Sequence, residues 1–531
     1  TRPCSRHIRI GLLVGASACA VCPAAEVDGS VPWSRLVFRA ELRPLWSADG
    51  SSLWYRVRTG PASHEFVRVW LPTGARQSGP DPASLGWPTP NSVRTSSLGT
   101  ERYATRHTGP ELALRFTNAT DRPVELVWLN TEGDAVGYGR LEAGTQRVQH
   151  TFEGHVWLIR DAECEVDWAV YEARPEDGTV IVDGPGRPAS PKPAEADAGR
   201  GVSSPNGRWR AWVERDRVWL KDAQNGSVRP LTTDRDGRPA FDTAIQWAPD
   251  SSAFVVAHGR PVPPRTIPLL DSRPAGSLHP RLIRIPYPKP GDPLPQPVPV
   301  LFRLDATGRH ESVAIETPLA TNAARESLHI PVRWAPDGRE FYFDHDQRGH
   351  QVYRILAVNA RDGSVRCVAE ETSRTFVDAA HKTWRHWLDT TGELIWMSER
   401  DGWCHLWLYD IRTGQPIRQL TRGEWVVREV VRVDEAAREV WFLASGRRAG
   451  EDPYHRHLCR VNLDGGEVVQ LTDADGDHEV EFSPSGEWFI ARWSRPDHPP
   501  VHELRAARDG RCIATLERAD ISALLAAGWT L

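Results

Sequence analysis

Several side chains of the kinds that perform chemistry stand close together in this 531-residue sequence. Glu370 and Glu371 form a carboxylate pair, which is either an anchor for an amine or a solvated charge on a loop. His455 and His457 place two imidazoles on one face of a strand, which suits either a metal ion or a structural role between strands. No Gly-x-Ser-x-Gly elbow occurs, and scattered Ser, His and Asp residues do not define a triad, because a triad is a matter of geometry. We therefore predict no catalytic residue, no metal and no cofactor.

The elements that carry these residues are β-hairpins that recur along the chain. The run Trp334-Ala335-Pro336-Asp337-Gly338 ends one strand, turns, and leads into the alternating run Glu340-Phe341-Tyr342-Phe343. Related turns begin at Trp46, Ser204, Trp247 and Ser483. A second marker, Leu-Thr, closes segments at 231–232, 420–421 and 471–472. Two markers that recur together favour a repeat architecture over unrelated hairpins in a β-sandwich.

The spacing of the turns indicates the kind of repeat. Asn206 and Asp250 lie 44 residues apart, and Asp250 and Asp337 lie 87 apart, close to one and two steps of a four-stranded blade. We therefore predict an all-β fold, a β-propeller of seven or eight four-stranded blades. The 23 Trp residues and the hydrophobic content of 40% fit a large β-rich core.

Composition also excludes some classes of function. The 65 basic and 70 acidic residues give a net charge of -5, so nothing indicates a nucleic-acid partner. After the N-terminal region, no apolar run approaches the roughly 18 residues that a membrane span needs.

The first 29 residues are typical of an export signal. Arg2, Arg6 and Arg9 precede an apolar and small-residue stretch that contains Ala18-Cys19-Ala20. We expect a periplasmic or extracellular protein, with a lipid-modified Cys19 as the alternative. The five cysteines beyond this leader are an odd number without a Cys-x-x-Cys pair, so no disulfide framework is predicted, although one or two bridges remain open.

Composition shifts divide the rest of the chain. We predict a first blade at 30–75, a linker at 76–104, a separate sandwich at 105–183, a second linker at 184–203 and the main propeller at 204–519. The proline-dense segment 261–299 is expected to form an extended loop or an edge that covers a blade. Residues 520–531 contain a short helix that Gly528 ends, and we expect them to begin a connection to a further domain.

One group of residues gives the propeller a specific likeness. It comprises Ser398-Glu399-Arg400-Asp401-Gly402-Trp403, His405 to Asp410, Gln419 to Trp425, Arg456 to Val461, Phe482 to Gly486 and Tyr287-Pro288-Lys289. This group resembles the N-terminal propeller of the dipeptidyl peptidase IV branch of the prolyl oligopeptidase family. The resemblance implies a partner α/β-hydrolase domain of the same longer polypeptide, which would hold the catalytic triad and is absent from this chain. Relatives hold the substrate's amine with paired glutamates, and segment 236–247 has no such pair, so the resemblance does not carry over dipeptide release.

A second group of residues, between about 110 and 165, has another likeness. It comprises Trp128-Leu129-Asn130, Tyr138, Gly144-Thr145, His150-Thr151-Phe152, Gly154 to Leu158 and Arg160-Asp161. These residues resemble the β domain of the von Hippel-Lindau tumour suppressor, a β-sandwich that binds a hydroxyproline peptide. The resemblance implies a peptide site at Trp128, Tyr138, His150, Thr151, His155 and Trp157. Aromatic faces can enclose a pyrrolidine ring, while the Thr151 hydroxyl and the His155 imidazole can pair with its hydroxyl group.

Together these features predict the non-catalytic, substrate-gating propeller of an exported serine peptidase that acts on short proline-containing peptides. The inserted sandwich would add a surface for hydroxyproline peptides. The alternative is a propeller that binds hydroxyproline peptides by itself, without catalysis.

Overall fold

The computed structural model describes residues 36–531 except 48, 87–90, 101, 106–110, 132–133, 164–165, 175–176, 186–200, 233–239, 261, 264, 275–277, 306 and 316–327. The predicted export leader lies outside the described residues. The α-helix among the described residues, α1 (Ser522–Ala526), stands where a short helix before Gly528 was predicted. None of the helices described is long and apolar enough to cross a membrane.

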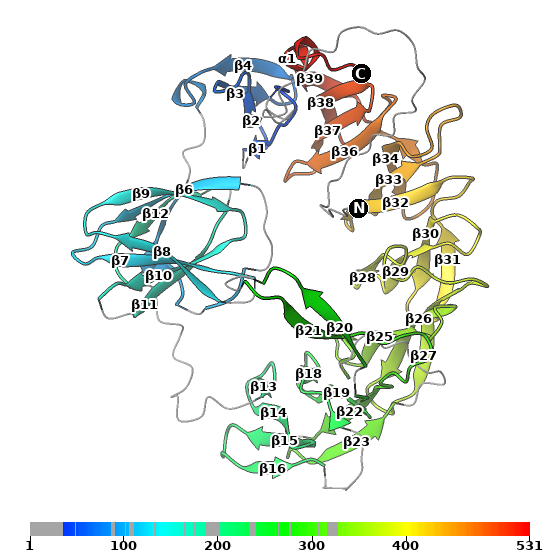
Figure 1. Cartoon of the computed structure of the whole chain (residues 1–531). Coiled ribbons are helices and arrows are strands. Elements are labelled where there is room, and N and C mark those ends of the chain that lie inside the picture. The colour runs from blue at the N-terminus through cyan, green and yellow to red at the C-terminus, as the bar shows by residue number, and fades with distance from the viewer. Residues whose placement is uncertain are drawn as a thin grey trace.

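Seven antiparallel sheets of the described chain follow one another around an open ring (Figure 1). The first contains β1 (Leu45–Trp46), β2 (Ser52–Arg58), β3 (His64–Trp70) and β4 (Ala75–Gly79). The second contains β13 (Val202–Ser203), β14 (Trp209–Glu214), β15 (Arg217–Asp222) and β16 (Val228–Pro230). The third contains β17 (Ala240–Phe241), β18 (Gln246–Trp247), β19 (Ala253–Gly259), β22 (Val298–Leu304) and β23 (His310–Ala314).

The remaining four sheets complete the series. The fourth contains β24 (Arg333–Trp334), β25 (Glu340–Asp346), β26 (Val352–Asn359) and β27 (Val365–Thr372). The fifth contains β28 (Arg385–Leu388), β29 (Glu393–Ser398), β30 (His405–Asp410) and β31 (Gln415–Gln419). The sixth contains β32 (Val426–Asp434), β33 (Glu439–Ser445), β34 (Arg456–Asn462) and β35 (Val469–Gln470), and the seventh β36 (Asp477–Phe482), β37 (Trp488–Arg495), β38 (His498–Ala506) and β39 (Cys512–Arg518). The prediction of an all-β propeller is confirmed, and none of the described sheets belongs to an α/β-hydrolase domain.

The repeated turn is the connection between the first and second strands of a blade. In the fourth blade, Trp334 pairs with Phe341 across β24 and β25. Gly338 has φ +70°, and its amide N–H donates to the Ala335 carbonyl at 2.9 Å. A Cβ atom at Gly338 would lie 2.9 Å from the Asp250 side chain, which belongs to the equivalent turn of the preceding blade. Backbone conformation and crowding between blades therefore both favour glycine here.

The repeated Leu-Thr marker has a physical explanation. The hydroxyls of Thr232, Thr421 and Thr472 accept the backbone N–H groups of Val218, Leu406 and Leu458 at 3.0, 2.9 and 3.0 Å. Each of these donors lies near the start of the third strand in its blade, as the second residue in β15 and β30 and the third in β34. The threonine thus satisfies a strand N–H beyond the end of the short fourth strand, where the ladder provides no carbonyl.

The first and last blades pack against each other. Leu53, Tyr55 and Val67 of the first blade share a buried cluster with Ile490 and Leu504 of the seventh. This packing joins the two ends of the blade series. The gap in the ring therefore falls between the first and second blades, beside the inserted sandwich (Figure 1).

The inserted sandwich consists of two four-stranded sheets. One contains β7 (Val124–Leu129), β8 (Ala135–Leu141), β10 (Val156–Asp161) and β11 (Asp167–Glu172). The other contains β5 (Asn91–Arg94), β6 (Glu111–Asn118), β9 (Gln146–Phe152) and β12 (Asp177–Val182), with β12 parallel to both β5 and β6. Leu114, Phe116, Leu126, Trp157 and Val180 contribute to the core between the sheets.

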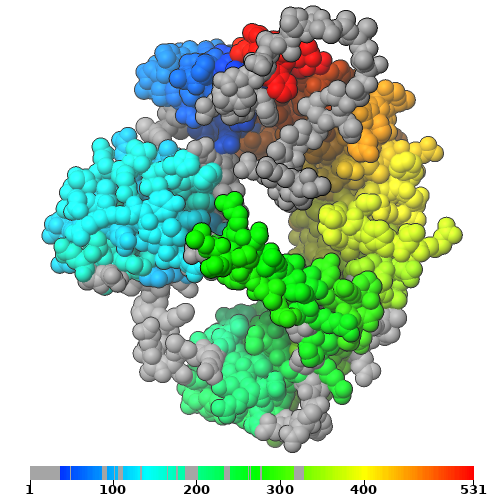
Figure 2. Space-filling view, viewed as in Figure 1, coloured from blue at the N-terminus to red at the C-terminus, as the bar shows by residue number. Residues whose placement is uncertain are grey.

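Two predicted connections contain more regular structure than expected. Residues 76–104 were predicted to be a linker, but β4 completes the first blade and β5 joins the sandwich. The linker predicted at 184–203 likewise ends in β13, the first strand of the second blade. The proline-dense segment contains a hairpin of β20 (Thr266–Asp271) and β21 (Arg281–Pro286), which projects from the third blade (Figure 2).

Candidate functional site

The six residues predicted to bind a peptide lie toward one end of the sandwich. Trp128 is on β7 and Trp157 is its direct partner on β10, so both indoles are on the same face of that sheet. Tyr138 is on β8, and Thr151 belongs to β9 of the opposite sheet. His155 lies in the turn that carries the chain from β9 to β10. Strand pairing and this single turn therefore bring five of the residues together.

Trp157 is the centre of one half of the site. It is almost fully buried, and its indole Nε1–H donates to the Thr151 hydroxyl at 2.9 Å. The half-exposed Tyr138 ring meets the Trp157 ring edge to face, with centroids 5.0 Å apart. Because Thr151 accepts the indole N–H, its own O–H and its second lone pair remain for another partner.

The other half of the site is a stack of rings. The Trp128 indole lies on the His155 imidazole with centroids 4.8 Å apart and an angle of 18° between the planes. The Phe152 ring contacts His155 at 5.1 Å and His150 at 5.2 Å. His155 is largely buried, whereas His150 is exposed. The alternation of β9 sends His150 and Thr151 to opposite faces, and Phe152 links His150 to His155.

Two further residues support the site and were not identified from the sequence. Phe152 contacts both histidines. Its position between His150 and His155 in the sequence could have indicated this role. The buried Thr105 hydroxyl accepts the Trp128 indole N–H and the Val156 backbone N–H, both at 3.1 Å. No strand pattern marks Thr105, because it lies in an irregular segment before β6. Its hydroxyl fixes the orientation of the Trp128 ring.

The arrangement combines a stiff aromatic wall with a hydroxyl and an imidazole at its base. Indole and phenol rings bury apolar surface at little cost in conformational entropy, which suits a flat, saturated ring such as pyrrolidine. The Thr151 hydroxyl is held by the Trp157 indole N–H, and the His155 ring is held by its stacking on Trp128. The site can therefore discriminate a ligand by a single hydroxyl group.

The carboxylate pair in the propeller has a different role. Glu370 and Glu371 lie on β27 rather than on a loop. Glu371 is buried and accepts the Ser398 hydroxyl at 2.7 Å, the Glu399 backbone N–H at 3.2 Å and the Arg400 guanidinium at 3.3 Å. These donors occupy its oxygens and tie the fourth blade to the fifth. The geometry favours a structural junction over an amine anchor.

Comparison with known families gives two matches. The model of the dipeptidyl peptidase IV N-terminal region matches residues 184–500. The model of the VHL beta domain matches residues 109–173, which include all six predicted site residues.

Comparison with individual proteins gives the same family. The chain is 26% identical over 272 residues to a protein of Neosartorya fischeri named "Probable dipeptidyl peptidase 4". The aligned region covers 48% of this chain and 34% of the relative. It is also 26% identical over 396 residues to "Probable dipeptidyl-aminopeptidase B" of Aspergillus niger, which covers 66% of this chain and 40% of the relative. The chain thus spans well under half the length of these curated relatives.

Among solved structures, the crystal structure of Porphyromonas gingivalis dipeptidyl peptidase 4 is similar. The match has 16% sequence identity and a TM-score of 0.44, and it covers 92% of this chain and 61% of that one.

Proposed function

Because the chain belongs to the family of the dipeptidyl peptidase IV N-terminal region, we propose that it forms the substrate-gating and substrate-recognition part of an exported serine peptidase. Its substrates would be short proline-containing peptides, and its partner an α/β-hydrolase domain of the same longer polypeptide. The inserted sandwich would bind hydroxyproline peptides. Relatives named as dipeptidyl peptidases support a peptide as the ligand.

One observation carries the proposal for the sandwich. The Thr151 hydroxyl is fixed by the Trp157 indole at 2.9 Å, and the aromatic rings of Tyr138, Trp157 and Trp128 surround it and His155. Thr151 and Trp157 are almost fully buried in the free protein. A ligand that pairs with Thr151 must therefore move a neighbouring side chain, and the half-exposed Tyr138 is the one that contacts Trp157.

The hydroxyl group of the ligand would provide the discrimination. A plain proline ring offers the same apolar surface to the aromatic wall, but it lacks the hydroxyl group that would pair with Thr151 and His155. Two such hydrogen bonds contribute about 2 to 3 kcal/mol, which is about 30-fold to 150-fold in affinity. The binding energy of the wall alone is common to both peptides.

The propeller would act as a filter. A ring of blades leaves a passage of limited width, so peptides reach a catalytic domain behind it more easily than folded proteins do. The residues of this chain supply no catalytic group to that reaction, since their sequence contains no nucleophile elbow.

Titration of a fluorescent hydroxyproline peptide with the purified chain tests the binding site. We expect Tyr138→Ala and His155→Ala each to weaken binding at least tenfold, because one removes an aromatic wall and the other a polar partner. Val148→Ala is a matched control, since Val148 is 60% exposed on the same strand as Thr151. Unchanged binding in both site variants would overturn the assignment.

A second assay tests whether residues 1–531 have peptidase activity by themselves. Purified residues 1–531 should not hydrolyse a Gly-Pro or Ala-Pro reporter substrate. Turnover that copurifies with the chain and follows its concentration would contradict a non-catalytic role.

A further inference from the structure

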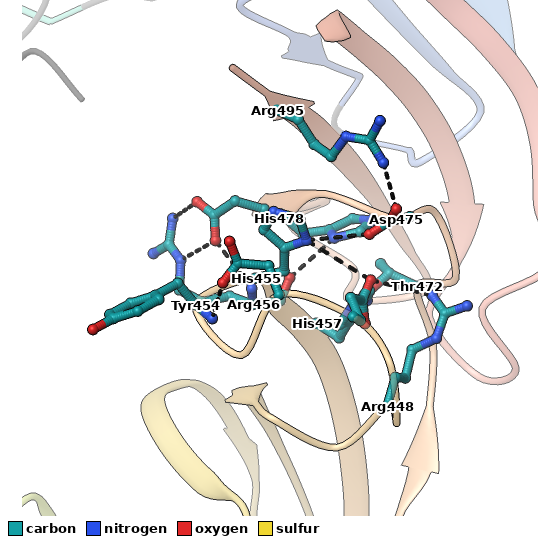
Figure 3. Close-up of polar contacts among 12 residues, drawn as sticks. Arg448, Tyr454, His455, Arg456, His457, Thr472, Asp475, His478 and Arg495 are labelled. Carbon is teal, nitrogen blue, oxygen red and sulfur yellow. Dashed lines mark hydrogen bonds and ion pairs between the residues drawn. The ribbon is translucent and has the colours of Figure 1, made fainter. Parts of the chain in front are cut away.

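Two loops of the propeller bring a second set of chemical groups together, far from the sandwich in the sequence. Glu451 and His455 lie in the connection between β33 and β34, and Asp475 lies in the connection from β35 to β36. Figure 3 shows His455 and Asp475 close to each other, with Arg495 on Asp475. The His455 Nδ1 atom is 3.3 Å from Asp475 Oδ1 and 3.9 Å from Glu451 Oε1. One donor atom of each residue lies within 4.8 Å of the other two.

The imidazole of His455 gives independent support for a ligand at this point. Its side chain is only 10% exposed, and Nδ1 faces the two carboxylates but makes no hydrogen bond. A buried ring nitrogen that makes no hydrogen bond loses the one that it would make with water. A cation between the nitrogen and the carboxylates would satisfy all three groups.

The Glu451 carboxylate is held by an outer layer of residues. His457 Nε2 donates to it at 2.9 Å, and the other ring nitrogen of His457 is 3.4 Å from the Thr472 hydroxyl. That hydroxyl accepts the Leu458 backbone N–H, so its own proton can go to His457 Nδ1. These contacts hold the His457 ring with Nε2 directed at the Glu451 carboxylate. Outer groups of this kind orient the carboxylates and imidazoles that bind metals.

The Asp475 carboxylate is oriented in a similar way. Arg495 forms an ion pair with Oδ2, which leaves Oδ1 directed at His455. Asp475 is 54% exposed, so solvent can reach the group from one side. On the other flank, Arg448 lies 3.5 Å from Glu451 Oε1. The two arginines offset the charge of the two carboxylates, and lower ligand charge weakens the affinity of a cation site.

We propose that Glu451, His455 and Asp475 form a binding site for a divalent transition-metal ion of the zinc class, with solvent in the remaining coordination position. Imidazole nitrogen combined with carboxylate oxygen is a donor set of zinc, whereas magnesium and calcium prefer oxygen alone. Zinc-to-ligand distances of about 2.0 to 2.2 Å place tetrahedral ligand atoms about 3.3 to 3.6 Å apart. His455 Nδ1 and Asp475 Oδ1 already have this spacing at 3.3 Å. The Glu451 oxygen, 3.9 Å from the same nitrogen, would have to move closer when the ion binds.

The position of the site gives it a function. Glu451 and His455 come from a loop of the sixth blade, while Asp475 belongs to the segment that leads into the seventh. An ion bound to all three residues would link the loop of one blade to the entry of the next. It would therefore stabilise this part of the ring, independently of any peptide bound by the sandwich.

Zinc titration of the chelator-treated full chain tests this proposal. We expect one equivalent of Zn²⁺ to bind with micromolar affinity, measured by calorimetry or by competition with a zinc-sensitive dye. His455→Ala and Asp475→Asn should each weaken binding at least tenfold. Zinc should raise the melting temperature of the unmodified protein and of the control variant, but not that of these two variants. His381→Ala is the matched control, because His381 forms a similar pair with Asp378 at 2.9 Å elsewhere in the propeller.

X-ray absorption of the zinc-loaded protein adds a readout of the ligands. The unmodified protein and His381→Ala should show an imidazole signal, and Asp475→Asn should retain it in whatever zinc it still binds. Binding below one equivalent, equal affinity in all four proteins, or a spectrum without imidazole would overturn the proposal. Asp475→Asn is conservative and partly exposed, so it remains informative if His455→Ala does not fold.

Discussion

Glu517→Gln tests how the ring of blades is closed. Glu517 lies on β39 of the last blade, and its side chain is 2% exposed. It accepts the Tyr55 hydroxyl at 2.8 Å and the Arg76 guanidinium at 2.7 Å on one oxygen, and Arg39 at 2.8 Å on the other. Tyr55, Arg76 and Arg39 all precede the sandwich in the chain. This carboxylate therefore joins the N-terminal segment to the last blade.

The loss of stability in Glu517→Gln depends on the contacts that each partner of Glu517 retains in the variant. Glutamine retains one acceptor oxygen but loses the charge. Arg39 keeps its contact with Glu65 at 2.6 Å, and both arginines are about one third exposed, so water can solvate them. The buried Tyr55 hydroxyl keeps the Leu516 carbonyl at 3.1 Å. We expect the first blade to lose about 3 kcal/mol of stability, near the lower end for a broken buried ion pair.

Hydrogen exchange followed by mass spectrometry measures this loss blade by blade. Amides of β2 and β3 should exchange about a hundredfold faster in Glu517→Gln, whereas amides of β6 and β7 in the sandwich should not change. Glu479→Gln is the matched control, since Glu479 forms an exposed pair with Arg492 at 3.0 Å in the same blade. Equal protection of β2 and β3 in the two variants would refute the reasoning.

Three further predictions concern the propeller. Thr421→Val should destabilise the protein by about 1 to 3 kcal/mol in urea titrations, because it leaves the buried Leu406 N–H without its acceptor; a loss no larger than that of the exposed variant Thr413→Val would contradict the role of the Leu-Thr marker. Cys404 and Cys459 should resist thiol reagents at pH 8 until the protein is unfolded. Both side chains are buried, and burial raises the pKa of their thiols to about 12 and about 11. Rapid labelling of the native protein at both positions would contradict this prediction. Burial lowers the pKa of His478 to about 3 and that of His502 to about 4, below the ordinary value of 6.5, so the unfolded chain binds protons that the folded chain does not. Stability should therefore be flat with respect to these groups above pH 7 and fall as the pH drops from about 6.5 towards 4, at up to about 1.4 kcal/mol per pH unit for each histidine; His502→Gln should reduce the slope, and an unchanged slope would argue against a buried neutral imidazole.

The sequence predicted the propeller because its turns are determined locally. The positive φ of the Pro-Asp-Gly turn favours glycine, and the threonine after three of the fourth strands satisfies one strand N–H, so both leave a regular mark. The boundaries of the first linker could not be predicted in the same way. Strand β4 is a short edge strand of exposed, largely polar residues, without the alternation that marks a half-buried strand.

The two candidate sites differ in how many of their residues could be predicted from the sequence. The aromatic residues of the sandwich were named from a family resemblance, and strand pairing then explains why Trp128 and Trp157 lie together. The contribution of Thr105 depends on a tertiary contact that no local pattern records. The same is true of Glu451 and Asp475, which lie on different loops and meet only because consecutive blades pack side by side. Spacing along the chain identified His455 and His457, but it did not identify the carboxylates that would bind a metal ion together with His455.

The central claim is that the sandwich recognises a hydroxyl group on a proline ring. The most direct measurement is the dissociation constant of the unmodified chain for two peptides that differ only in that hydroxyl. We predict that the hydroxyproline peptide binds about 30-fold to 150-fold more tightly than the proline peptide, which corresponds to two hydrogen bonds. Equal affinity for the two peptides would contradict the account.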